Sequence, residues 1–173
     1  MIGLYRGKSL TSWGIKWFSW SSYSHASWIL SDGSVIEAWH RGGVRHVKNW
    51  NMNHRRGTKI NVYRIKGITP EQTRAIEDFL RSQVGKKYYF WGIMRFLSRR
   101  RNRRRTRAPA DVNRWFCSEL VFEACRQAGI TLLANVEAHQ VTPGMLAQSP
   151  LLEFVETRTT RRVGKDEYYA EVN

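Results

Sequence analysis

Short runs of hydrophobic and β-branched residues along the chain predict several strands. The segments 23–30 and 35–39 flank Asp32-Gly33, a pair that is typical of hairpin turns. The remaining runs that predict strands are 44–47, 60–65 and 151–157. The pattern therefore indicates a small sheet that begins with a hairpin.

A helix with clear boundary signals is predicted to begin at Pro70. Thr69 is the expected N-cap, and Gln72 would complete a capping box around the first turn. Gly85 follows the expected end of this helix. The expected buried stripe consists of Ala75, Ile76, Phe79 and Leu80.

A second helix is predicted over 117–128, and it ends before Gly129. Its expected buried positions are Leu120, Val121, Ala124 and Ala128. Near the other end of the chain, Thr142-Pro143-Gly144 is expected to start a short turn or helix.

The segment 9–20 has helical spacing of tryptophan, with Trp13, Trp17 and Trp20 on one face. Two interpretations stay open. The stripe could be an interfacial membrane anchor, or it could be an aromatic face of the core. Gly14 and several serines weaken the anchor.

The length of 173 residues suits a single domain, which we expect to span 1–173. With 42% hydrophobic residues, the chain has enough apolar surface for a core, and general disorder is excluded. No apolar run approaches the roughly 18 residues of a membrane span, and the start lacks a signal-peptide pattern. These features predict a cytoplasmic protein by default. The residues from about 164 are expected to form a polar tail.

The formal net charge of +15 is unevenly distributed. Eight arginines and no acid lie between 95 and 107, which leaves a moderately basic remainder. We expect the segment at about 98–109 to be an insertion. The candidate contacts in it are Arg99, Arg100, Arg101, Arg103, Arg104 and Arg105. They could bind nucleic acid, an anionic membrane, a virion protein or acidic envelope polymers, or they could form a solvated loop.

The two cysteines are predicted to have different roles. Cys117 and Cys125 are about 12 Å apart on one helix at 1.5 Å per residue, which excludes a disulfide between them. Cys125 lies on the apolar stripe and is expected in the core. Cys117 lies at the predicted helix N-terminus, where unpaired N–H groups stabilise a thiolate and could hold an oxyanion.

His25 and Glu37 lie on the two strands of the predicted hairpin. With the turn near Asp32-Gly33, Glu37 pairs close to Ser27 or Trp28, within diagonal reach of His25. The carboxylate would then orient the imidazole, and the other ring nitrogen would face a cysteine. This is the arrangement of a nucleophile, a base and an orienting residue.

These motifs resemble the permuted branch of the NlpC/P60 papain-like superfamily, which includes YiiX-like proteins and lecithin:retinol acyltransferase-like enzymes. In that branch the histidine hairpin precedes the cysteine helix, as here. The matching segments are Tyr23–Ile29, Val35–Ala38, Gly85–Tyr88, Phe116–Val121 and Val141–Gly144. The segments 4–10 and 22–26 also resemble small phage-carried members, which favours a phage-type source. If a phage encodes it, the protein is expected to be virion-associated or released on lysis.

The resemblance implies an α+β, circularly permuted papain-like fold with a small antiparallel sheet packed on the cysteine-bearing helix. It implies Cys117 as nucleophile, His25 as general base and Glu37 as the orienting third residue. Glu37 is closer to the YiiX-like pattern, because the acyltransferase-like members often have histidine there. Tyr23 matches a family tyrosine that would line the site or help to bind the oxyanion, or it is a packing residue.

The implied function is a cysteine hydrolase that cleaves amide bonds, with cell-wall peptide as the favoured substrate. One alternative is a lipid acyl hydrolase or acyltransferase at a membrane surface. Another is a non-catalytic virion component or nucleic-acid-associated component of the same fold. No metal or cofactor is expected. The expected partner is an anionic envelope polymer or peptide substrate, and the sequence leaves the oligomeric state open.

Overall fold

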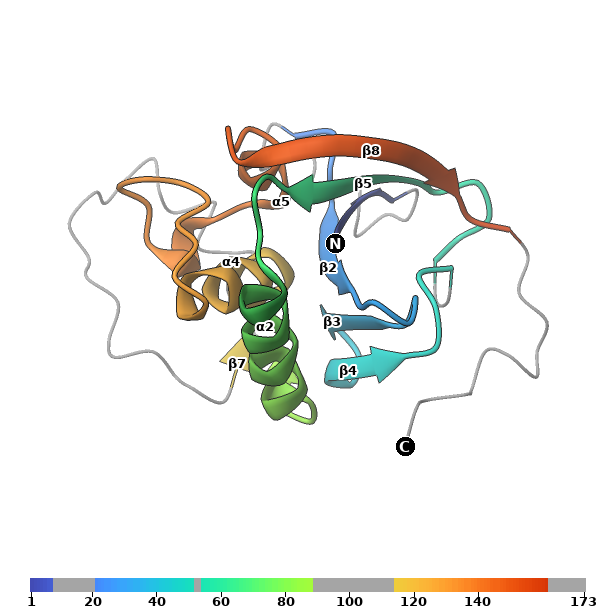
Figure 1. The fold of residues 1–173 in the computed structure, drawn as a ribbon. Helices are drawn as coiled ribbons and strands as arrows, with labels where there is room; N and C mark the ends of the chain where they lie inside the picture. The colour runs from blue at the N-terminus through green and yellow to red at the C-terminus, as the bar shows by residue number, and fades with distance from the viewer. Residues whose placement is uncertain (8–20, 52–53, 89–113, 162–173) are drawn as a thin grey trace, which may run out of the picture.

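A six-stranded antiparallel sheet forms the centre of the computed structural model, which describes residues 1–7, 21–51, 54–88 and 114–161. The strand order is β4-β3-β2-β1-β5-β8, and the sheet is strongly curved (Figure 1). Its strands are β1 (Ile2–Arg6), β2 (His25–Ile29), β3 (Val35–Trp39), β4 (Gly43–Val47), β5 (Lys59–Ile65) and β8 (Leu152–Thr159).

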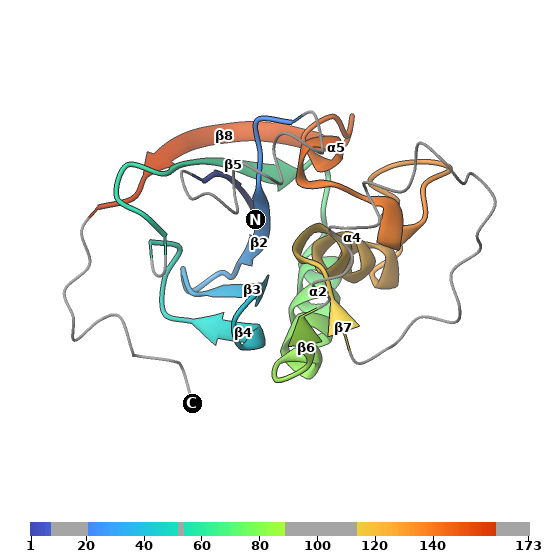
Figure 2. The ribbon, with the colours of Figure 1, turned by 180° about the vertical axis from the view of Figure 1, so that it is seen from behind.

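The helices lie together on one side of this sheet, as both ribbon views show (Figures 1 and 2). They are α2 (Pro70–Gln83), α4 (Cys117–Gln127), the 3₁₀ helix η1 (Ala138–Gln140) and α5 (Pro143–Leu146). A separate parallel pair consists of β6 (Lys87–Tyr88) and β7 (Arg114–Trp115). The expected α+β fold, with an antiparallel sheet packed on the cysteine-bearing helix, is therefore confirmed.

The two faces of the sheet bury different side chains because neighbouring strand residues point to opposite faces. On the helix side, Trp28 and Ile36 join the core that includes Leu120 of α4. On the other side, Ile29 and Val35 pack in a second cluster. His25 and Glu37 are in phase with this second set, so their side chains leave the sheet on the face turned away from the helix core.

Helix α2 confirms the predicted start and corrects one predicted core position. Thr69 accepts from the Gln72 backbone N–H at 3.2 Å, and its own N–H donates to the Gln72 side chain at 3.1 Å. Ile76 and Leu80 are buried and Phe79 is partly buried, but Ala75 is exposed. The prediction for Ala75 was therefore wrong. Consecutive residues of a helix are rotated by about 100° around its axis, so Ala75 lies beyond the edge of the buried stripe that contains Ile76 and packs on α4.

Strand β1 was not predicted from the sequence, although it lies between β2 and β5 in the sheet. It has five residues and is buried on both faces, so it shows no alternation of polar and apolar positions. The predicted helix at 9–20, the insertion at 98–109 and the tail from 164 lie outside the described residues. Within the described part of the chain, no helix has the length and apolar character to span a membrane.

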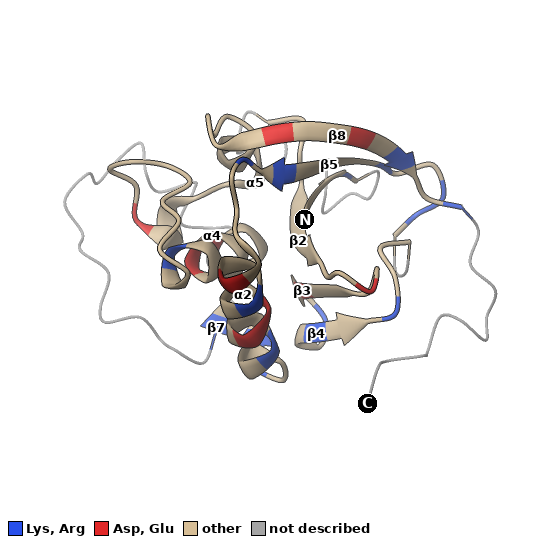
Figure 3. Cartoon of the chain, in the orientation of Figure 1, with Lys and Arg blue, Asp and Glu red and all other residues tan. Residues whose placement is uncertain are grey.

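Charged residues of both signs are spread over the described elements, with acids and bases on α2 and on β8 (Figure 3). Arg64 pairs with Glu153 across β5 and β8 at 2.9 Å, and Arg74 pairs with Glu71 on α2 at 3.0 Å. These pairs are exposed and contribute little to stability. In each pair the positive charge of the arginine offsets the negative charge of the glutamate.

The glycine pair at the start of β4, Gly42-Gly43, brings that strand against β6. Gly42 and Gly43 both have positive φ, at 100° and 80°. A Cβ on Gly43 would lie within 2.1 Å of the Lys86 carbonyl oxygen, whereas a Cβ on Gly42 would meet no atom within 4 Å. The same carbonyl accepts from the Val44 N–H at 2.8 Å. Only glycine therefore allows this backbone contact at position 43.

We expect Gly43→Ala to destabilise the protein more than Gly42→Ala. Both changes place a Cβ at positive φ, which costs about 1–2 kcal/mol. Gly43→Ala adds a collision with backbone, and overpacking of this kind costs about 1–3 kcal/mol more. Urea unfolding of the two variants measures the difference, and equal losses of unfolding free energy would contradict the contact.

Candidate active site

The side chains of His25 and Glu37 meet across two neighbouring strands. The pairing of Trp28 with Ile36 sets the register, and it places Glu37 diagonally across from His25. The Nε2 atom of His25 lies 2.6 Å from Oε2 of Glu37, and both residues are buried. The contact that was expected from the hairpin register is therefore present.

The second oxygen of Glu37 is held by an arginine that the sequence analysis did not select. Arg45 lies directly opposite Glu37 on β4, and it donates to Oε1 from Nε at 3.0 Å and from Nη2 at 2.6 Å. Its guanidinium also lies 4.6 Å from the centre of the Trp39 ring. The sequence signal for this pairing is the Gly42-Gly43 turn, because it predicts that β3 and β4 form a hairpin with Arg45 near Glu37.

The charged form of Glu37 is stabilised although its side chain is only 1% exposed. Burial by itself would raise the pKa of this carboxyl, but His25 and Arg45 outweigh burial and hold the pKa well below its usual range. Because removing either partner leaves a buried carboxylate short of a donor, this group depends on both neighbours.

Cys117 is the first residue of α4, as the sequence predicted, and it is buried. The N-cap is Phe116, whose backbone N–H donates to the Glu119 side chain at 3.4 Å. The next residue, Ser118, donates to the Val141 carbonyl oxygen at 2.6 Å. The N-terminal end of α4 is thereby fixed against the segment that leads into α5.

The imidazole of His25 interacts with both Glu37 and Cys117. Burial lowers its pKa, but the charges and hydrogen bonds of these two groups outweigh burial and raise the pKa to about 9. The protonated imidazole is therefore the favoured form at neutral pH. Since Nε2 lies against Glu37, the ring nitrogen that is left for Cys117 is Nδ1.

A second histidine, His54, has its side chain almost buried beside this pair, and the sequence analysis did not select it. Its ring stacks on Tyr5 with centroids 4.1 Å apart, and it meets Trp39 edge-on at 5.1 Å. Its Nε2 lies 3.8 Å from Oε2 of Glu37. Burial lowers the pKa of His54 to about 3, so its ring is neutral. Nothing in the polar sequence around it distinguishes this histidine from a surface residue.

Three residues at this site are of the types that bind metal ions. His25, Glu37 and His54 offer ligand atoms that lie within 4.8 Å of one another. Both oxygens of Glu37 are already bonded, however, to His25 and to Arg45. A cation would have to displace His25 from Glu37 beside the positive charge of Arg45, so the residues as arranged do not fit a resident metal ion.

Tyr23 lies two residues before His25, but its hydroxyl turns towards β5. It accepts from Nδ2 of Asn61 at 2.7 Å and lies 2.9 Å from the Tyr63 hydroxyl. Its predicted help in binding an oxyanion stays a prediction. The six candidate arginines of the predicted insertion lie outside the described residues.

Cys125 is the second cysteine, and its placement matches the core residue that the sequence predicted. It is 0% exposed on α4, and neither it nor Cys117 is in a disulfide. Burial raises the pKa of Cys125 to about 12. Its thiol is therefore protonated, and it is separate from the His25–Glu37 pair.

No family model matches the sequence. The chain is 30% identical over 136 residues to the probable lipoprotein peptidase YaeF of Escherichia coli K12. The match covers 78% of this chain but 45% of YaeF, so the chain spans less than half of the length of that relative. The phage-type source remains a prediction.

Among solved structures, the fold is similar to that of YiiX from Escherichia coli O157:H7, which is described as a metalloprotein. The TM-score is 0.66 at 20% identity, with 91% of this chain and 96% of YiiX covered. At this identity the likeness concerns the fold. The chain is therefore similar in sequence to part of YaeF and similar in fold to YiiX.

Proposed function

We propose that the protein is a cysteine hydrolase that cleaves amide bonds, with Cys117 as nucleophile, His25 as acid and base, and Glu37 as the orienting residue. The observation that carries this proposal is the buried 2.6 Å contact between His25 and Glu37, in an imidazole that also interacts with Cys117. A charged carboxylate, an imidazole and a thiol in series are the parts of a thiol-hydrolase mechanism.

In the first step, the Cys117 sulfur attacks the carbonyl carbon of the amide. The oxyanion that forms is stabilised by backbone N–H groups at the start of α4. Collapse of this intermediate breaks the C–N bond, and the imidazolium of His25 gives its proton to the leaving amine. The products of this half-reaction are an amine and a thioester on Cys117.

In the second step, water hydrolyses the thioester. Neutral His25 takes a proton from the water as its oxygen attacks the acyl carbon. Breaking the C–S bond releases the carboxylic acid and restores the Cys117 sulfur beside a protonated His25. Throughout both steps, Glu37 keeps the ring oriented and stabilises its positive charge, while Arg45 keeps Glu37 ionised.

The substrate class that we propose is a peptide amide, with cell-wall peptide as the first material to test. The relative YaeF is named a probable lipoprotein peptidase, which supports peptide chemistry. The net charge of +15 would favour approach to anionic envelope polymers. The fold neighbour YiiX is named a metalloprotein, but we derive no step through a metal because both oxygens of Glu37 are bonded to protein donors.

We expect Cys117→Ala to abolish release of peptide fragments from purified peptidoglycan, because the substituted chain has no nucleophile. Mass analysis of the products of both proteins is the measurement. Identical product sets would contradict the function proposed for Cys117. Products from neither protein would remove cell-wall peptide as the substrate.

We expect iodoacetamide at pH 6–7 to alkylate Cys117 faster than it alkylates Cys125. The proposed mechanism requires a reactive sulfur at position 117, whereas burial raises the pKa of the Cys125 thiol to about 12. Peptide mapping of the alkylated protein over time measures both rates, so Cys125 serves as the internal control. A rate at Cys117 no higher than that of a model thiol would contradict an activated thiolate.

We expect Glu37→Gln to reduce the hydrolysis rate about 100-fold to 10,000-fold, because the amide keeps the shape but loses the charge. It should also lower the pKa of His25 from about 9. NMR titration of the imidazole signals measures this shift, with the partly exposed His46 as the unchanged control. An unaltered His25 titration would contradict the role of Glu37.

The raised pKa of His25 also predicts how stability depends on pH. Its ordinary value is 6.5 and its folded value is about 9, so the charged ring stabilises the fold fully below pH 6.5. This contribution is lost as the pH rises from 6.5 through 9. The unfolding free energy should therefore decrease from pH 6.5 to pH 9.5, and this decrease should be smaller in Glu37→Gln than in the unsubstituted protein. Urea unfolding at the two pH values measures it.

A further inference from the structure

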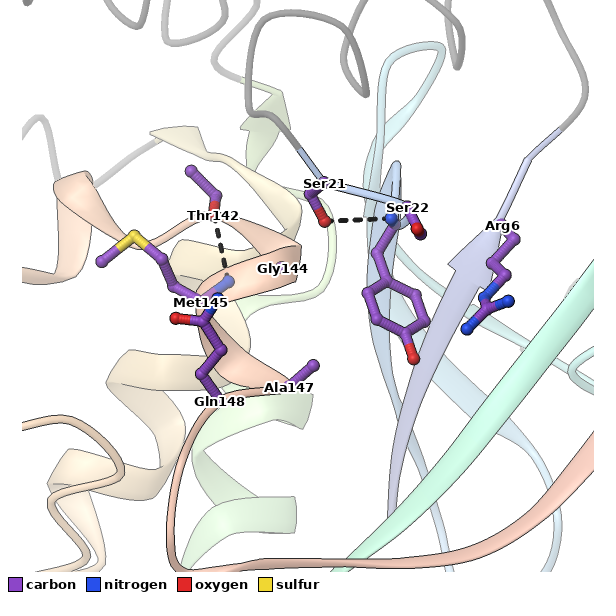
Figure 4. A pocket seen from close by; sticks show the side chains of 9 residues that line it. Arg6, Ser21, Ser22, Thr142, Gly144, Met145, Ala147 and Gln148 are labelled. Carbon is purple, nitrogen blue, oxygen red and sulfur yellow. Dashed lines mark hydrogen bonds between the residues drawn. The ribbon is translucent and has the colours of Figure 1, made fainter.

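A polar pocket of about 280 Å³ lies between the last residue of β1, the segment before β2 and helix α5 (Figure 4). The residues that line it are Arg6, Ser21, Ser22, Tyr23, Thr142, Gly144, Met145, Ala147 and Gln148. This volume is at the lower limit of small-molecule sites, and it suits one amino-acid residue rather than a large ligand.

One wall of the pocket belongs to the segment that leads into His25, and the other follows a residue that is hydrogen-bonded to the neighbour of Cys117. Tyr23 precedes His25 by two residues, so their Cα atoms are at most about 7.6 Å apart. On the opposite wall, Thr142 follows Val141, whose carbonyl accepts from Ser118 next to Cys117. The pocket therefore adjoins the proposed active site.

The two walls approach closely where Gly144 faces Ser21, and hydrogen bonds within each wall fix its local shape. A Cβ on Gly144 would lie 2.1 Å from Oγ of Ser21, so only glycine allows this approach. Ser21 accepts from the Tyr23 N–H at 3.0 Å, and Thr142 accepts from the Met145 N–H at 3.2 Å (Figure 4). These bonds shape the pocket before any ligand enters.

The lining contains one cation and no acid. Arg6 is exposed, and within the described part of the chain no carboxylate pairs with it. Its guanidinium lies 5.2 Å from the centre of the Tyr23 ring, and the bonds of Tyr23 to Asn61 and Tyr63 fix that ring. A guanidinium placed in this way can donate two parallel hydrogen bonds to a carboxylate.

We infer that this pocket is a substrate subsite for a residue that carries a carboxylate, and that Arg6 is the group that binds it. The hydroxyl of Ser22 and the amide of Gln148 supply further polar contacts at the pocket wall. This inference rests on the proposed function, since it makes the preferred substrate an acidic peptide. Because Arg6 is the one charged residue among the described residues of the lining, the pocket should bind a negative group better than a neutral or positive one.

The test is a binding experiment that needs no turnover. The full chain with Cys117→Ala is titrated with N-acetyl-glutamate α-amide and with N-acetyl-glutamine α-amide, which differ by one carboxylate. Backbone ¹⁵N–¹H NMR gives the affinities and the location of the shifts. We expect about tenfold or tighter binding of the glutamate compound, with shifts at 21–23 and 142–148.

Additional substitutions separate the role of Arg6 from general charge. Arg6→Gln should remove the preference for the carboxylate, and Arg6→Lys should retain part of it because the charge remains. Arg74→Gln on α2 is the matched control, since it removes the same charge from an exposed side chain outside the pocket lining, and it should change nothing. Equal affinity for the two compounds, or a preference that survives Arg6→Gln, would overturn the inference.

Failure of this test is distinguishable from failure of the proposed function. Hydrolysis that depends on Cys117, together with equal binding of the two compounds, would remove the carboxylate subsite and keep the cysteine hydrolase. Selective binding through Arg6, together with hydrolysis unaffected by Cys117→Ala, would keep the anion pocket and remove the proposed nucleophile.

Discussion

The buried carboxylate of Glu37 sets the conditions that the rest of the site must meet. A charge in this position is costly unless donors surround it, and here His25 and Arg45 together occupy both oxygens. These two donors come from the strands on either side of β3. Because a slip of one residue would turn the side chains to the opposite face, the carboxylate also constrains the register of β2, β3 and β4.

The site depends equally on contacts that join the sheet to the helices. His25 leaves the sheet on the face opposite the helix core, whereas Cys117 begins the helix that packs on that core. The N-terminal end of α4, where Cys117 lies, is held by the bond from Ser118 to the Val141 carbonyl oxygen. This hydrogen bond, made by the residue next to Cys117, thus restricts where the thiol can lie.

Two arginines near the site have different electrostatic roles. Arg45 is bonded to Glu37 and is 14% exposed, so its charge maintains the carboxylate. Arg6 is exposed at the pocket wall, and among the described residues it has no carboxylate partner. The first supports the catalytic chemistry that we propose, and the second is available to a substrate. The general positive charge of the chain gives no basis for this distinction.

The sequence by itself determined the helix start at Cys117, the His25–Glu37 hairpin and the capping of α2, because each depends on residues close together in the chain. It did not reveal β1, whose place in the sheet comes from pairing with β2 and β5. Nor did it select His54, which is a buried neighbour of Glu37 only because a distant loop folds back over Tyr5. Local pattern specifies local structure, whereas the tertiary fold alone decides which distant side chains share a buried environment and how their charges interact.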